Sequence, residues 1–164
     1  MTELAIPLAE FDAEMASTRR LIERIPFEKA QWKPHPKSFA LGHLTQLVAW
    51  MPGWIASTLR EPVMDIAGGG EGGGYTFEKT EKLASMFDAN VQKARAALEA
   101  VTGGALDETW TLRMGPRTLM AMPKREAVRQ HMNHLCHHRG QLTVYARLVD
   151  VSVPMIYGPT ADER

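Results

Sequence analysis

The sequence predicts an all-α fold, in which a single domain of residues 1–164 forms a four-helix bundle. Apolar residues recur at steps of three and four in four separate segments, which is the period of a helix with one buried face. Apolar residues also make up 45% of the chain, enough for one hydrophobic core. The connectors differ in length, which predicts at least one crossover connection between the helices.

The first two predicted helices flank a proline-rich connector. An apolar stripe from Leu4 to Ile25 predicts a helix that ends at Pro26. Helix cannot continue through "PFEKAQWKPHP", residues 26–36. Ser38 is the expected N-cap of the second helix, and Pro52 is expected to kink that helix because it removes a backbone donor. One face of the second helix collects five residues: Ala40, His43, Leu47, Trp50 and Trp54.

A glycine run follows the second helix. The segment "AGGGEGGG", residues 67–74, is expected to form a surface loop, because glycine is entropically costly inside a helix or strand. It lacks the Lys-Ser/Thr ending of a phosphate-binding loop. The third helix is expected over residues 76–101, and Gly103-Gly104 is a typical C-terminal signal.

The last third of the chain combines an extended segment with a long helix. Residues 107–123 surround the turn signal Gly115-Pro116, and they predict an extended connection or a short hairpin. Pro123 suits the first turn of a fourth helix that is expected to reach Asp150. The tail "VPMIYGPTADER" is too rich in proline for helix.

Composition excludes several classes of protein. Lys plus Arg and Asp plus Glu both number 19, so no basic surplus predicts a nucleic-acid partner. No apolar run approaches the roughly 20 residues that cross a bilayer. The N-terminal sequence lacks the features of a signal peptide, and the one cysteine fits a reducing compartment. We therefore expect a cytoplasmic protein without a membrane partner.

Histidines supply the clearest functional signal, because four of the six lie between positions 131 and 138. His134 and His138 are four residues apart, so their imidazoles share one face of a helix and can converge on one ion. His43 is the best third ligand, since it lies on the apolar face of the second helix and a buried imidazole needs a partner. These three residues predict a metal site.

Other assignments stay open for the remaining histidines and the cysteine. A core histidine bonded to a backbone carbonyl is the alternative to a metal ligand, and His131 could replace one member of the triad. His137 is expected at the surface or beside a ligand, and His35 in solvent. Cys136 points away from His134 and His138, so we expect a small buried apolar residue there.

Three segments resemble the DinB-like metal-binding family: "FALGHLTQLVAW" (39–50), "NHLCHHRGQL" (133–142) and "VPMIYGPTADE" (153–163). The resemblance covers essentially the whole chain. It implies an up-down-down-up four-helix bundle, often a homodimer, with the family's histidine triad on His43, His134 and His138. It also implies zinc, nickel, iron or manganese at the triad. Relatives of known activity in this family are S-transferases and isomerases that use low-molecular-weight thiols such as bacillithiol, mycothiol or glutathione.

Three imidazoles leave at least one coordination position open, which is typical of a catalytic site. The leading hypothesis is therefore a metal-dependent S-transferase that joins a small-molecule thiol to an electrophile. The alternatives are a non-catalytic metal-binding or stress-response protein and a metal-water hydrolase. Four residues have open supporting roles at the site, with helix surface as the alternative for Gln141 and core packing as the alternative for Trp50, Trp54 and Tyr145. Arg139 could bind an anionic group of a thiol cofactor, with a surface salt bridge as the alternative.

Overall fold

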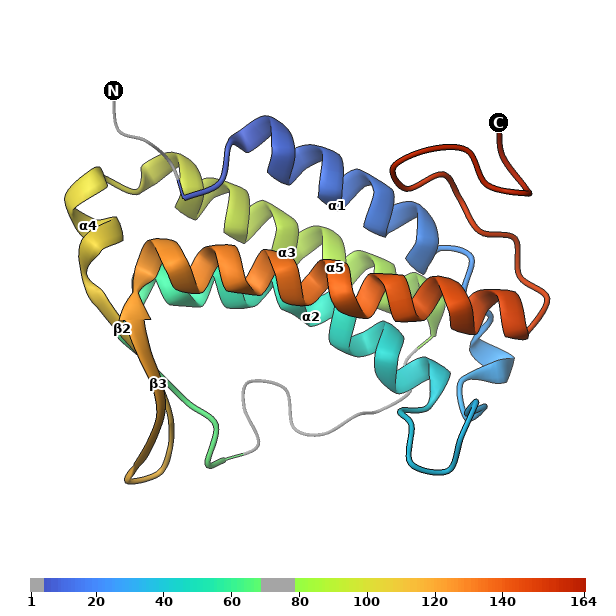
Figure 1. Ribbon diagram of the computed structural model, residues 1–164, viewed down its shortest axis with the longest axis horizontal. Helices are drawn as coiled ribbons and strands as arrows, with labels where there is room; N and C mark the ends of the chain where they lie inside the picture. Colours follow the sequence, from blue (N-terminus) through green and yellow to red (C-terminus); the bar gives the residue numbers. More distant parts are fainter. Residues whose placement is uncertain (1–4, 69–78) are drawn as a thin grey trace.

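The computed structural model describes residues 5–68 and 79–164. Its frame consists of four long helices: α1 (Leu8–Ile22), α2 (Leu41–Arg60), α3 (Thr80–Ala100) and α5 (Lys124–Leu148). In Figure 1, α1 and α5 run in one direction while α2 and α3 run in the opposite direction. Helix α2 packs against both α3 and α5, and α1 packs against α3. The described chain is therefore mainly helical, as the sequence predicts.

The hydrophobic core lies between these helices. Each helix presents an apolar face at the three-four spacing seen in the sequence, and large side chains on that face are buried. The buried set includes Phe11, Leu21, Leu44, Met51, Ile55, Phe87, Leu98, Leu135 and Leu142. Burial of one such side chain contributes roughly 1.5–3 kcal/mol, so these faces provide the main force that holds the helices together.

Prolines mark two of the helix starts. Pro7 directly precedes α1 and Pro123 directly precedes α5, both with extended backbone. The prediction that Ser38 caps the second helix is wrong, because α2 begins at Leu41 after Ala40. The proline-rich connector takes over that role. Its carbonyl groups at Trp32 and Ala30 accept the amide hydrogens of Leu41 and Gly42 at N–O distances of 2.8 and 2.9 Å.

The other helix boundaries differ from the predictions by a few residues. The first helix ends at Ile22, and the chain then forms the short 3-10 helix η1 (Phe27–Lys29) within the proline-rich connector. The predicted start of the third helix at residue 76 lies outside the described residues, as does most of the glycine run at 67–74. Pro52 lies inside α2.

The all-α prediction is wrong in one respect, because three short strands form a sheet beside the helices. The strands are β1 (Val63–Asp65), β2 (Thr109–Met114) and β3 (Arg117–Pro123). The hairpin expected over residues 107–123 is confirmed as β2 and β3, which pair antiparallel. Gly115 forms its turn with a φ of 58°, a conformation that glycine adopts without strain. Strand β1 pairs parallel to β2, with Val63 opposite Thr111.

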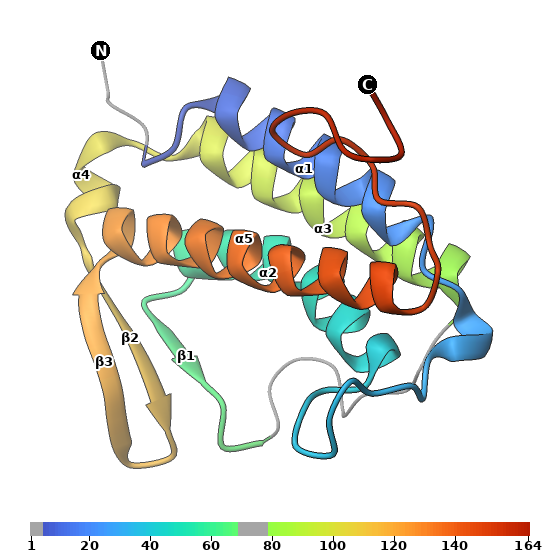
Figure 2. The ribbon, with the colours of Figure 1, turned by 45° about the vertical axis from the view of Figure 1, so that its right-hand side comes forward.

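The sheet projects from one end of the helices, as Figure 2 shows. Trp110 of β2 fixes it there, because its side chain is buried and its ring lies 5.5 Å from that of His131 on α5. The short helix α4 (Gly103–Asp107) connects α3 to the hairpin. Within residues 5–68 and 79–164, no helix combines the length and the apolar character needed to cross a membrane.

Candidate metal site

Two of the three predicted ligands lie together on α5. The Nε2 atoms of His134 and His138 are 2.9 Å apart, and the ring centroids are 4.7 Å apart. The four-residue spacing on a continuous helix produces this arrangement, as the sequence predicts. His138 is only 9% exposed, whereas His134 is open to solvent. The pair therefore has a protected member and an accessible one.

Gln141 holds the far side of the His138 ring. Its Oε1 atom lies 2.8 Å from Nδ1 of His138, three residues earlier on the same helix. This contact places Gln141 beside one of the predicted ligands. His137 is exposed, and its ring lies 5.0 Å from that of His138 without a hydrogen bond between the two rings. Its surface position agrees with the sequence interpretation.

The third predicted ligand, His43, lies near the first turn of α2, and its Nε2 atom is buried. Its ring stacks on Phe39 at a centroid distance of 4.2 Å, and Phe39 also lies 6.2 Å from the ring of His138. Phe39 therefore connects the two helices at this site. Among residues 5–68 and 79–164, however, no group of three His, Cys, Asp or Glu side chains is arranged to hold one ion. The structure brings together His134 and His138 without assembling the triad.

All three imidazoles favour the neutral form, which is the form that binds a metal. Burial lowers the pKa of His43, and the charge of Lys33 lowers it further. Burial also lowers the pKa of His134, with smaller contributions from His138 and His137. The pKa of His138 is lowered mainly by burial, against an opposing contribution from the Gln141 hydrogen bond.

The histidine pair can be compared with the geometry that an ion requires. Two nitrogens bonded to a tetrahedral zinc ion at about 2.0–2.1 Å lie about 3.3 Å apart. The 2.9 Å between the Nε2 atoms of His134 and His138 is a few tenths of an ångström shorter, a difference that small side-chain rotations remove. The pair therefore fits two adjacent coordination positions. The third position requires that the side chain of His43 moves toward the pair.

His131 has a structural role that differs from the predicted spare ligand. Its Nε2 atom lies 3.0 Å from Oγ1 of Thr58, and its ring contacts Trp110 and Trp54 edge-on. Burial lowers the pKa of His131 to about 4, so the ring is neutral at physiological pH. The ring therefore joins α5, α2 and the sheet. Trp54 also lies 5.9 Å from the ring of His134 and forms part of the wall beside the pair.

The other residues singled out in the sequence are exposed or contact other side chains. His35 is exposed, as expected. Tyr145 packs edge-on against Trp32 at 5.6 Å, which supports the core-packing alternative. The indole Nε1 of Trp50 donates to the sulfur of Met86 on α3, at 3.1 Å. Neither of these two contacts involves His134 or His138.

A buried polar cluster was not predicted. The guanidinium of Arg139 is 2% exposed, and its Nη1 atom lies 2.6 Å from Oε2 of Glu14 on α1. Nη1 also donates to the hydroxyls of Ser17 and Thr18, at 2.9 and 3.1 Å. The prediction of a surface salt bridge for Arg139 is wrong, because its ion pair with Glu14 is buried. The sequence spacing could have predicted this burial, because Arg139 lies four residues after Leu135 and three before Leu142, in the buried stripe.

The C-terminal tail completes this cluster. The hydroxyl of Tyr157 accepts a hydrogen bond from Nη2 of Arg139 at 2.6 Å and lies 3.5 Å from the sulfur of Cys136. Cys136 is half-buried among these polar groups, so the prediction of a buried apolar environment is wrong. Burial raises the pKa of its thiol. Cys136 and Arg139 face α1 and the tail and make no hydrogen bond to the histidine pair.

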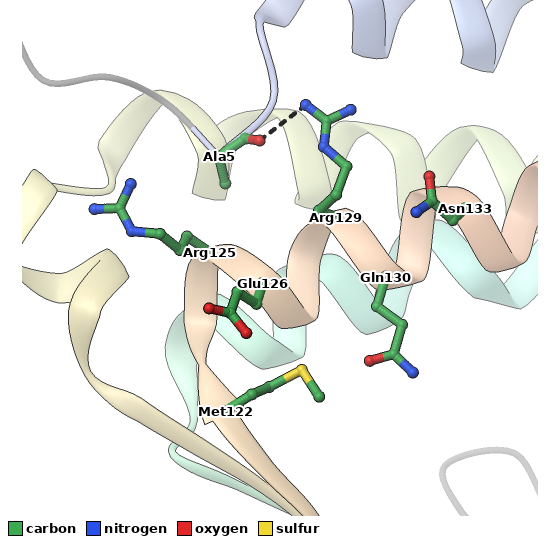
Figure 3. A pocket seen from close by; sticks show the side chains of 7 residues that line it. All are labelled: Ala5, Met122, Arg125, Glu126, Arg129, Gln130 and Asn133. Atoms are coloured by element: carbon green, nitrogen blue, oxygen red, sulfur yellow. Dashed lines mark hydrogen bonds between the residues drawn. The ribbon is translucent and has the colours of Figure 1, made fainter.

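A further pocket lies elsewhere on α5. Its volume is about 510 Å³, and Figure 3 shows its lining residues: Ala5, Met122, Arg125, Glu126, Arg129, Gln130 and Asn133. Both arginines have partners. Arg125 pairs with Asp107, and Arg129 pairs with Glu10 and donates to the carbonyl of Ala5. None of the predicted ligands lines the pocket, so it is separate from the candidate metal site.

Comparisons with known proteins identify the family and agree with the fold. A family model described as the DinB family matches residues 6–164. A DinB-like protein from Bacillus subtilis has a TM-score of 0.66 at 20% identity, over 96% of this chain and 97% of the other. A DinB-like protein from Bacillus cereus has the same TM-score at 21% identity, over 92% and 95% of the two chains. No curated protein matches the chain. Since the family model covers nearly every residue, the chain belongs to the DinB family.

Proposed function

We propose that this protein binds one divalent transition-metal ion through the Nε2 atoms of His134 and His138, with His43 as the third ligand. The observation that carries the proposal is the 2.9 Å separation between the two Nε2 atoms. Phe39 supports the choice of His43, because its ring contacts both His43 and His138. Binding requires a side-chain movement, since no three-ligand group is assembled in the part of the chain that the structure describes.

Zinc, nickel, iron and manganese are the ions that we propose for this site. Imidazole nitrogen suits several first-row ions, and three such ligands leave at least one position open for another molecule. The lowered pKa of each histidine supports the proposal, because the ligands need not lose a proton to bind at neutral pH.

We further infer that the activity is transfer of a small-molecule thiol to an electrophile. In this reaction the thiol sulfur forms a bond to an electrophilic carbon, and the leaving group and the thiol proton depart. When bound, a divalent ion lowers the pKa of a coordinated thiol, so that the thiolate is present at neutral pH. His134 is exposed, and Phe39 is 42% exposed beside the site, so a small apolar electrophile has both access and a ring to pack against.

Hydrolysis by an activated water has less support. That reaction benefits from a carboxylate general base near the bound water. In the described part of the chain, the hydrogen-bond partners of His134 and His138 are each other and Gln141, and none of them is a carboxylate.

Metal titration of single variants tests the binding proposal. We expect wild-type protein to take up about one zinc or nickel ion per chain and His138→Ala to lose that binding, because the protected member of the pair is removed. His134→Ala and His43→Ala should weaken it. His137→Ala is the matched control, since His137 is an exposed neighbour on the same helix. Equal affinity in wild type and His138→Ala would exclude this site.

Turnover assays separate an enzyme from a metal-binding protein. Metal-loaded protein is incubated with bacillithiol, mycothiol or glutathione and with a chromogenic electrophile. We expect a rate above the protein-free reaction for at least one thiol, and we expect His138→Ala to remove it. If no thiol supports turnover while the metal still binds, the protein is a non-catalytic metal-binding or stress-response protein.

A further inference from the structure

Three side chains on one face of α5 form a continuous hydrogen-bonded chain. Oε1 of Gln141 lies 2.8 Å from Nδ1 of His138, and Nε2 of His138 lies 2.9 Å from Nε2 of His134. The spacings of three and four residues along the helix produce this alignment. Both nitrogens of His138 are thereby engaged, one with an amide and the other with a second imidazole.

The chemistry of these groups suggests an assignment for each proton. A neutral imidazole carries one N–H donor and one acceptor nitrogen, and an amide oxygen only accepts. With Oε1 of Gln141 facing Nδ1 of His138, we assign the hydrogen between them to Nδ1. Nε2 of His138 then holds a lone pair, so the hydrogen between the two rings belongs to Nε2 of His134.

We propose that Gln141 is a positioning residue, which holds His138 with its Nε2 lone pair presented to an ion. This inference rests on the proposed metal-binding function and adds which of the two histidines is ready to bind the ion. His138 is the ligand prepared for the ion in advance. His134, the exposed member of the pair, must move its proton from Nε2 to Nδ1 before it can bind. A hydrogen bond to the outer nitrogen of a ligating histidine is a general way to fix its tautomer and ring orientation.

Nitrogen-15 NMR of the histidine rings tests the proton assignment in metal-free protein at about pH 8, where both rings are neutral. We expect Nδ1 of His138 to be protonated in the wild type and Nε2 to be unprotonated. Gln141→Met, which keeps the side-chain length but removes the acceptor, should give a mixture of the two tautomers. Gln141→Glu should keep the wild-type tautomer, because its carboxylate also accepts.

Zinc affinity tests the positioning role with the same variants. Loss of such a hydrogen bond typically weakens metal binding about 10- to 100-fold, so we expect that loss in Gln141→Met and recovery in Gln141→Glu. Gln130→Met is the matched control, because Gln130 is an exposed glutamine on the same helix that lines the separate pocket. We expect it to bind zinc like the wild type.

The outcomes distinguish this inference from the proposed function. A hydrogen on Nε2 of His138 in the wild type overturns the proton assignment, because it means that the Gln141 amide group donates instead of accepting. Unchanged zinc affinity in Gln141→Met, with binding lost in His138→Ala, overturns the positioning role alone. If the wild type binds no metal ion, the proposed function fails with the positioning role, while the tautomers still decide the proton assignment.

Discussion

Nη1 of Arg139 and Oε2 of Glu14 lie 2.6 Å apart, and the two side chains are only 2% and 15% exposed. The pair joins α5 to α1 across a contact that is otherwise small, and Ser17 and Thr18 supply further acceptors for the guanidinium. A buried charge with a full set of partners is stable, but the loss of one partner leaves the other charge buried and uncompensated.

Arg139→Met should therefore destabilise the protein strongly. Removal of one member of a buried ion pair typically costs about 3–5 kcal/mol, and we expect a loss of that size in the free energy of unfolding, measured by urea denaturation. The double variant Arg139→Met/Glu14→Met should recover part of the loss, because it removes both charges. Arg95→Met is the control, since its ion pair with Asp12 is exposed, and we expect no measurable change. A loss in the control as large as that in Arg139→Met would contradict the role of burial.

Tyr157 should shield Cys136 from solution. Its hydroxyl lies 3.5 Å from the cysteine sulfur, although the tyrosine itself is 76% exposed. We expect Tyr157→Ala to increase the rate of alkylation of Cys136 by iodoacetamide severalfold, as followed by mass spectrometry. Tyr157→Phe keeps the ring and should react at nearly the wild-type rate. Equal acceleration in both variants would show that the hydroxyl contact, and not the ring, limits the reaction.

Protonation of His131 should destabilise the protein in mild acid. Its pKa is about 4 in the folded protein and 6.5 in the unfolded chain, so between these values the unfolded chain binds a proton that the folded protein does not. Stability should therefore fall as the pH drops from 6.5 to 4, by up to about 3 kcal/mol from this residue.

His131→Gln isolates this contribution, because glutamine does not titrate in that range. Urea denaturation at several pH values should give a shallower decline for His131→Gln than for the wild type. His35→Gln, at an exposed position, should decline like the wild type. Parallel curves for the wild type and His131→Gln would show that His131 titrates alike in the folded and unfolded chains.

Asp162 should hold the C-terminal tail in place. Its carboxylate pairs with Arg147 at 2.5 Å and accepts the amide hydrogen of Val153 at 2.8 Å, and these contacts lower its pKa. A carboxylate with a lowered pKa contributes stability above its usual pKa, and that contribution is lost as the pH falls through the lowered value. We expect Asp162→Ala to speed hydrogen exchange at the Val153 amide at neutral pH. Thr143→Ala, a helix-surface change on α5, should leave that rate unchanged.

Local sequence patterns predicted the elements that local interactions determine. The spacing of apolar residues located the four long helices, and Gly115-Pro116 located the hairpin turn. Strand β1 was missed because Val63–Asp65 has only three residues, too few to show an alternating pattern, and its partner β2 lies far along the chain. The N-cap of α2 was missed for a related reason, since carbonyl groups of the preceding connector replace the side-chain cap.

The candidate site also combines features that local sequence determines with features that depend on distant segments. His134 and His138 were predicted to meet because helix geometry alone brings them together. The position of His43 depends on how α2 packs against α5, which the spacing of residues within either helix does not determine. The burial of Arg139 depends on Glu14 and on Tyr157 of the tail, which come from opposite ends of the chain.

The parallel pairing of β1 with β2 constrains the order in which the molecule folds. The hairpin of β2 and β3 closes over a two-residue turn, whereas β1 must find a partner about fifty residues further along, with α3 between them. Closing so long a loop is slow, because the chain loses conformational entropy before the stabilising contacts between the two strands form. We therefore expect β1 to join the sheet last, after the intervening helix has docked.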